Sequence, residues 1–213
     1  MSWSIENDDS DTDLQDLLGA LNRAHSAGIL MFCSCIDRGA SRKDDTYPGT
    51  SGYAIKIGAA NSSGEKLQWV STSQSDYLLP GENVQPQEPT ADAWSGYRSG
   101  PFGSSIATAL AAGLAGVLLY CDRLIECPDR FTTLSGDKVD YLRGVNNMKT
   151  VLDNMKGKSS QFIEVGNNLE RYFPTPQDII WNRKKDKGAK TKEELESFMW
   201  AMKGKPVRRG APG

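Results

Sequence analysis

Two adjacent serines, Ser104 and Ser105, follow a glycine-containing loop and open a long apolar segment, SSIATALAAGLAGVLLY. Because this segment has the length of a helix, both hydroxyls are expected in its first turn, where backbone N–H groups have no partner within the helix. Such N–H groups can stabilise the negative charge that develops on a carbonyl oxygen during acyl transfer. The same pattern is typical of a serine that only caps a helix, and local physics alone favours the cap.

Few other residues in the sequence could do chemistry. There is a single histidine, His25, and among the four cysteines Cys33 and Cys35 are two positions apart. Side chains at that spacing lie on one face of a strand and seldom form a disulfide, so buried free thiols are expected. No paired CxxC or HExxH spacing is present, and we expect neither a metal nor another cofactor.

The charge pattern argues against nucleic acid as a partner. The formal charge is -2, with six acids and no base in the first 21 residues. The stretch from 183 to 209 carries ten bases and four acids, a mixture typical of a solvated tail. No stretch approaches the roughly 20 apolar residues of a membrane span. The first residues also lack the basic and apolar regions of an export signal. A soluble chain with no membrane contact is therefore expected.

The segments that must position the serines indicate an α/β organisation. Leucines at 14, 17, 18 and 21 form an apolar helical stripe, which leads into GILMFCSC, an apolar run typical of a strand buried on both faces. YAIKIGAA and KLQWVST predict two strands joined by a hairpin at NSSG, and DYLLPG predicts a shorter strand. The segment 104–120 is apolar on nearly every face, which predicts a helix buried in the domain centre.

The character of the sequence changes after residue 121. VNNMKTVLDNMKG, FIEVGNNLERYF and TKEELESFMWAMKG have helical periodicity and are separated by Gly, Pro and Ser. We expect a domain boundary near Leu134 to Asp140. The predicted parts are residues 1–134, a helical extension over 135–203 and a disordered tail over 204–213.

Residues 103–113 resemble the nucleophile motif of the subtilase (subtilisin-like) serine peptidase family, Gly-Thr-Ser-x-Ala-x-Pro-x-x-Ala-Gly. With Ser104 in the place of threonine, the match falls on Gly103, Ser105, Ala107, Ala112 and Gly113. The segments HSAGILMFCSCIDRG, YPGTSGYAIKIGAANSSG, DYLLPGENV and MSWSIE resemble further segments of this family, in the family's order. The resemblance covers residues 1 to about 121 and implies a three-layer α/β fold with a parallel central sheet.

The resemblance also implies roles for particular residues. Ser105 falls on the nucleophile, and Asp37 falls on the asparagine of the oxyanion hole. A carboxylate at this place repels the developing oxyanion unless it is protonated, when it can donate one hydrogen bond. Ile36 replaces a glycine beside the primary specificity pocket and is expected to narrow it. The implied substrate-binding positions are Ser2, Trp3, Ser4, Ser34, Cys35 and Ile36.

The family's catalytic aspartate and histidine lie on elements that precede the segment opened by Met1. His25 does not correspond to either, because it lies on the amphipathic helix before the first buried strand. Without a base beside Ser105, the hydroxyl is a poor nucleophile at neutral pH, so we expect this chain alone to be inactive. The resemblance thus implies an N-terminally truncated sheet with an exposed edge that a protein partner would cover.

Two functions are consistent with these residues. The first is a serine endopeptidase that forms an acyl-enzyme on Ser105, takes peptide or protein substrates and is complete only in a longer chain. The second is a non-catalytic module that binds a protein through the residual groove and the C-terminal helices. An upstream reading frame encoding Asp and His segments favours the first function, and its absence favours the second. The resemblance favours the cytoplasm as the location.

Overall fold

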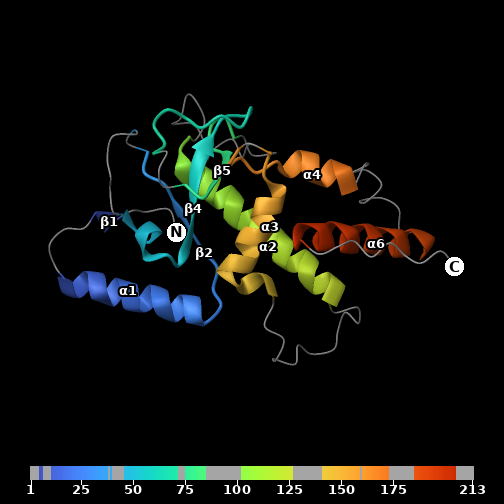
Figure 1. Ribbon diagram of the computed structural model, residues 1–213, viewed down its shortest axis with the longest axis horizontal. Helices are drawn as coiled ribbons and strands as arrows, with labels where there is room; N and C mark the ends of the chain where they lie inside the picture. The colour runs from blue at the N-terminus through green and yellow to red at the C-terminus, as the bar shows by residue number, and fades with distance from the viewer. Residues whose placement is uncertain are drawn as a thin grey trace, which may run out of the picture. The chain divides into compact units, whose positions relative to one another are not determined.

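The computed structural model describes residues 5–6, 11–37, 39, 46–71, 75–84, 102–126, 141–158, 160–172 and 185–204 (Figure 1). The chain forms two compact units. The first unit comprises Met1–Leu114 and Lys158–Ile163, and the second comprises Ala115–Gly157 and Glu164–Gly213. The expected boundary at residues 134–140 and the expected tail beyond residue 204 lie outside the described residues.

The first unit is built on a three-stranded parallel sheet in the order β2-β4-β5. Its strands are β2 (Met31–Ser34), β4 (Ala54–Ala60) and β5 (Tyr77–Pro80). All three coincide with continuous apolar runs, because a parallel strand covered on both faces has no polar side. A second, two-stranded antiparallel sheet joins β1 (Ile5–Glu6) to β3 (Thr46–Tyr47). The α/β prediction is confirmed, with helices packed against the parallel sheet.

Helix α1 (Asp11–Ser26) packs against one face of this sheet. Leu21 is buried with Met31 and Ala54, so the apolar stripe of α1 lies against β2 and β4. The helix ends at Ser26, and Gly28 two residues later has a φ of 69°, the left-handed conformation that often follows helices. Its N–H donates to the carbonyl of His25 at 2.9 Å, and the chain then enters β2.

The predicted hairpin strand at KLQWVST is wrong. Only an isolated antiparallel bridge between Ala60 and Lys66 forms. The chain turns immediately afterwards, because the N–H of Val70 donates to the carbonyl of Leu67 at 3.0 Å. The N–H of Ser71 then donates to Ile36, on the segment after β2. The residues after Lys66 are therefore held as a loop against the end of the sheet. A short 3-10 helix, Gly49–Ser51, precedes β4.

Helix α2 (Ser104–Glu126) begins where predicted and is longer than predicted. Its buried positions, at three- and four-residue steps, form one face that includes Ala107, Ala111 and Leu118. On the other face Val117 is 59% exposed and Tyr120 62% exposed. The prediction of a helix buried all round is therefore wrong within the described residues. An apolar sequence shows which residues can be buried, but it does not show how much of the helix surface other elements will cover.

The length and composition of α2 also correct the expectation that no stretch approaches a membrane span. Residues Ser104–Ile125 are long and apolar enough to cross a membrane, and a third of the most apolar window is buried (33%). A single such helix is weak evidence, because core helices of soluble proteins meet the same criterion.

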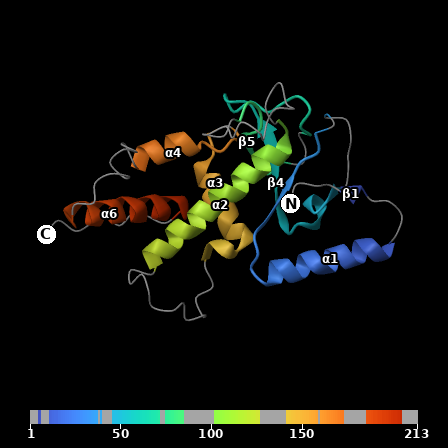
Figure 2. The same cartoon turned by 180° about the vertical axis from the view of Figure 1, so that it is seen from behind.

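The second unit is helical in its described part. It contains a 3-10 turn (Tyr141–Arg143), α3 (Val145–Met155), α4 (Val165–Tyr172) and α6 (Lys185–Met202). Figure 2 shows these helices from behind. Their core is rich in methionine, with buried side chains that include Met148, Met155, Met199 and Met202. A buried ion pair joins Asp122 of α2 to Lys203, which follows α6. The Lys203 ammonium also lies 5.2 Å from the ring centroid of Tyr141.

A short segment from late in the sequence returns to the first unit and covers the edge of β5. Leu78 donates to the carbonyl of Gln161 at 2.9 Å and accepts from the N–H of Ile163 at 3.0 Å. The Gln161 amide donates to the carbonyl of Ser75 at 2.8 Å. The predicted helical segment FIEVGNNLERYF is therefore helical only from Val165 onward.

Candidate active site

The carboxylate of Asp37 holds the first residue of α2. Its Oδ2 accepts a hydrogen bond from the backbone N–H of Ser104 at 2.7 Å. Its Oδ1 accepts one from the Ser104 hydroxyl at 2.6 Å. The same hydroxyl accepts the N–H of Ala59 at 3.1 Å. Asp37 is exposed, whereas Ser104 is fully buried (0%). The three residues thus form a continuous hydrogen-bonded link from β4 through α2 to the loop after β2.

Parallel topology brings these groups together. Asp37 lies three residues after Ser34, the last residue of β2, and Ala59 is the penultimate residue of β4. The carboxyl ends of parallel strands share one edge of the sheet, where ligand sites of α/β proteins are usually found. The first turn of α2 reaches this edge, because the N–H of Gly103 donates to the carbonyl of Gly81 beyond β5 at 2.7 Å. Figures 1 and 2 show this turn behind the strands in one view and in front of them in the other.

Gly103 allows the backbone to meet Asp37 closely. Its φ of 122° is disfavoured for residues with a side chain. A Cβ at this position would lie 2.9 Å from Oδ2 of Asp37. The glycine that the sequence pattern singled out therefore has a local physical role, because it lets the carboxylate reach the helix N-terminus.

Ser105 is the second residue of α2 and is exposed, in contrast to its buried neighbour Ser104. The structure thus brings Ser105 and Asp37 to the same helix end, as the resemblance implied. The local sequence gave Ser104 the role of a helix cap. Its side chain instead bonds outside its own helix, to Asp37 and Ala59. Only a tertiary contact reveals this role, since nothing in the local pattern distinguishes it.

The implied substrate-binding residues divide into two groups. Ser2, Trp3 and Ser4 lie outside the described residues. Ser34 and Ile36 are half-buried and Cys35 is buried at the end of β2. The N–H of Cys35 donates to the carbonyl of Ile57 at 2.8 Å, which extends the ladder with β4. This segment is therefore fixed by the sheet and ends at Asp37.

The Cys35 thiol is unreactive. Burial, and to a smaller extent the neighbouring Cys33, raise the pKa of Cys35 to about 12. A thiol with this pKa is protonated at neutral pH and is a poor nucleophile. Cys33 and Cys35 are both buried thiols outside any disulfide, as predicted for positions two apart on one strand face.

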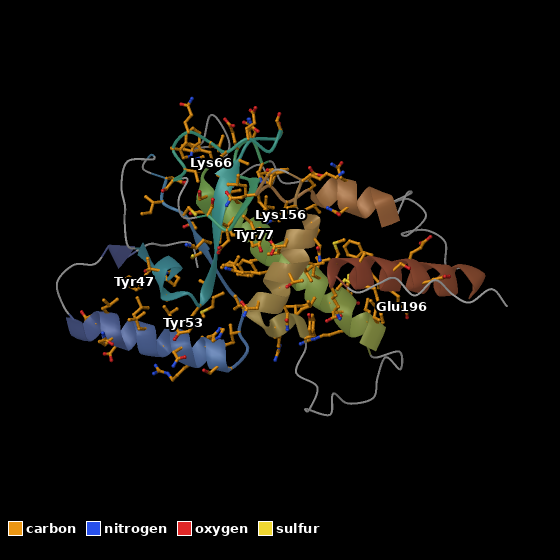
Figure 3. All side chains as sticks on the ribbon, in the orientation of Figure 1. Tyr47, Tyr53, Lys66, Tyr77, Lys156 and Glu196 are labelled. Carbon is orange, nitrogen blue, oxygen red and sulfur yellow. The ribbon has the colours of Figure 1, made fainter. Side chains whose placement is uncertain are left out.

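His25 lies at the opposite end of the sheet, beside the amino end of β2. It occupies the last turn of α1, which precedes the amino end of β2, and its ring lies 5.1 Å from that of Tyr53. Figure 3 labels Tyr53 beside α1. Asp37 and Ser104 lie at the carboxyl edge, and a strand of seven residues spans about 20 Å. The exposed His25 is therefore separated from Ser105 by about the length of the sheet.

An aromatic pair beside the site was missed by the sequence reasoning. The rings of Trp69 and Phe102 meet edge to face with centroids 6.2 Å apart. Phe102 directly precedes Gly103 and is 60% exposed. The carbonyl of Trp69 accepts the N–H of Gly39 at 2.8 Å, which ties the pair to the loop of Asp37. The signal in the sequence was two aromatic residues within segments otherwise rich in polar and small residues.

The fold and this site place the chain among α/β proteins that present a serine on the first turn of a helix at the carboxyl edge of a parallel sheet. The model of the subtilase family matches residues 1–123. The chain therefore belongs to the subtilase family. No curated protein matches it.

Solved structures of subtilisin-like proteins resemble the fold. The PatG macrocyclase domain is 14% identical with a TM-score of 0.53, and the match covers 81% of this chain and 51% of that chain. The self-cleaved protease domain of PatA is 17% identical with a TM-score of 0.50, covering 73% and 52% respectively. The chain thus spans about half the length of the solved structures it matches. At these identities the likeness concerns the fold alone.

Proposed function

We propose that this chain is the C-terminal part of a subtilisin-like serine endopeptidase domain, with Ser105 as its nucleophile. Membership of the subtilase family carries this proposal. The position of Ser105, exposed in the first turn of an apolar helix at the carboxyl edge of the sheet, supports it. The proposed domain is a three-layer fold that continues into a helical extension, and it takes peptide or protein substrates.

In the proposed reaction, the Ser105 oxygen attacks the carbonyl carbon of the scissile peptide bond. The serine proton passes to a general base and then to the amine that leaves when the C–N bond breaks. Water hydrolyses the resulting ester and regenerates Ser105. The base must come from a histidine other than His25, which lies at the far edge of the sheet, so the chain alone is proposed to be inactive.

A second candidate is a non-catalytic module that binds a peptide or protein. The observation that favours it is the contact between Asp37 and Ser104. The resemblance assigns Asp37 to the oxyanion position, where an acyl-transfer reaction would need hydrogen-bond donors rather than a carboxylate. In this function the loops at the carboxyl edge bind a peptide without cleaving it. The exposed face of α2 and the C-terminal helices would then offer additional contact surface.

The experiment that tests the first function is labelling with a fluorophosphonate probe, which reacts with activated serines. The transcript is first read upstream of Met1, and any continuous frame is expressed as one chain together with the 213 residues. Labelling of that longer chain, its loss in Ser105→Ala and its persistence in Ser62→Ala would support the endopeptidase. Ser62 is a matched control because it is an exposed serine in the turn after β4.

Three results would contradict the proposal. Labelling of Ser105 in the 213-residue chain would show that no further base is required. A longer chain with Asp and His segments that stays unlabelled, or a frame closed directly before Met1, would favour the non-catalytic module.

A further inference from the structure

The two oxygens of Asp37 each accept one hydrogen bond from the same residue, Ser104, at 2.7 and 2.6 Å. Hydrogen bonds to an ionised acceptor are stronger than neutral ones, so the pair forms a firm two-point contact. The Ala59 N–H donates to the oxygen of the Ser104 hydroxyl and so orients it. The hydroxyl proton of Ser104 is then donated to Asp37. Ser104 is fully buried, so its N–H and hydroxyl have no access to water, whereas the carboxylate of Asp37 is exposed.

This contact uses a donor that a substrate anion would need. The N–H of Ser104 lies at the beginning of α2, where it has no acceptor within the helix and donates to Asp37 instead, and the positive end of the helix favours negative charge there. The carboxylate lies directly on the Gly103–Ser104 peptide, since even a Cβ on Gly103 would be 2.9 Å from Oδ2. A negative charge that belongs to the protein therefore already occupies this helix end.

We propose that Asp37 is an internal blocking group, whose hydrogen bonds to Ser104 keep a second negative charge away from the first turn of α2. The inference rests on the proposed function, because the excluded charge is that of the tetrahedral intermediate on Ser105. It assigns Asp37 an autoinhibitory contact rather than the donor role of the asparagine it replaces. The site in this form accepts a neutral peptide carbonyl and disfavours its conversion to an oxyanion.

The test uses the backbone amide signals of the 213-residue chain in solution, with inorganic phosphate as the probe anion. In Asp37→Ala the amide of Ser104 loses its acceptor, and its hydrogen exchange is expected to accelerate at least about tenfold. Phosphate is expected to shift the Ser104 and Ser105 amides at a concentration about tenfold lower than in the unaltered chain. Asp76→Asn is the matched control, because Asp76 also accepts a backbone N–H, from Lys56 at 2.9 Å, and lies at the start of β5.

Asp37→Asn provides a second variant of the same size, which removes the charge and keeps one acceptor oxygen. It is expected to bind phosphate as Asp37→Ala does, and it keeps the test decisive if the alanine variant fails to fold. Unchanged exchange of the Ser104 amide, or equal phosphate binding in the unaltered chain and the variants, would overturn the inference. Every measurement is repeated in the Ser105→Ala background, so a failure of the proposed nucleophile does not affect the result.

Discussion

Replacing Ser104 by alanine tests whether its buried hydroxyl fastens α2 to the sheet. The hydroxyl donates to Asp37 at 2.6 Å and accepts the N–H of Ala59 at 3.1 Å, and both Ser104 and Ala59 are fully buried. Removal leaves a buried N–H without an acceptor, which costs about 1–3 kcal/mol. Loss of a hydrogen bond to a charged group costs about 1.5–3 kcal/mol. Because the two bonds share one oxygen and are not additive, we expect the free energy of unfolding to fall by about 2–4 kcal/mol.

The assay is urea denaturation followed by helical circular dichroism, compared with Thr108→Val in the same helix. The Thr108 hydroxyl is also buried and donates to the Ser104 carbonyl at 2.7 Å. That carbonyl lies four residues earlier in the helix and is also an acceptor for the helical backbone. Removing the Thr108 hydroxyl therefore leaves no buried group without a hydrogen-bond partner. We expect Thr108→Val to cost less than about 1 kcal/mol. Equal costs for the two variants would refute the reasoning.

The remaining predictions concern one close backbone approach, one buried thiol and one buried ion pair. Gly81→Ala is expected to cost about 3 kcal/mol, because the added Cβ would lie 2.4 Å from a neighbouring side-chain carbon. Gly113→Ala, where the Cβ meets nothing within 4 Å, is expected to stabilise the helix by up to about 1 kcal/mol, and urea midpoints distinguish the two. Burial raises the pKa of Cys35 from 9.0 to about 12. Its contribution to stability is therefore complete below pH 9.0 and is lost as the pH rises towards 12, so Cys35→Ala should flatten the fall of the melting temperature in that range. Asp122→Ala should cost about 3–5 kcal/mol, because it leaves Lys203 buried without its partner, and a double-mutant cycle with Lys203→Met should show that the two losses are not additive.

The local sequence pattern was sufficient to predict the helices and strands whose structure depends mainly on residues close by in the sequence. The runs that became β2, β4 and β5 are apolar except for Ser34 and Lys56, and the stripe of α1 has the helical period. Prediction from the local pattern failed where contacts with a segment distant in the sequence determine the structure. Residues after Lys66 alternate like a strand, yet the Ser71 N–H is taken by Ile36, some 35 positions away. Likewise, Phe162 appears in a helical pattern, but its neighbour Gln161 bonds to Ser75 across a separation of 86 residues.

The site was predictable only through the resemblance to subtilases. No spacing rule connects Asp37 to Ser104, because the carboxyl edge of the sheet brings them together across 67 residues. The resemblance singled out Asp37 and the serine motif, and in the structure Asp37 contacts Ser104. The roles of Ser105 as nucleophile and of Asp37 at the oxyanion remain predictions. The buried link through Ser104 and Ala59 was missed, because a serine that opens a helix has the same sequence signal whether it caps that helix or binds elsewhere.

The late segment that covers β5 has a consequence for synthesis of the protein. Leu78 pairs with Gln161 and Ile163, so the edge of β5 cannot be completed until about 85 further residues have been translated. At about 5–20 residues per second this takes roughly 4–17 s. During that interval β5 presents backbone groups that can pair with another chain, which is the usual route to edge-to-edge aggregation. The yield of folded protein should therefore depend on translation speed and on chaperones that bind nascent chains.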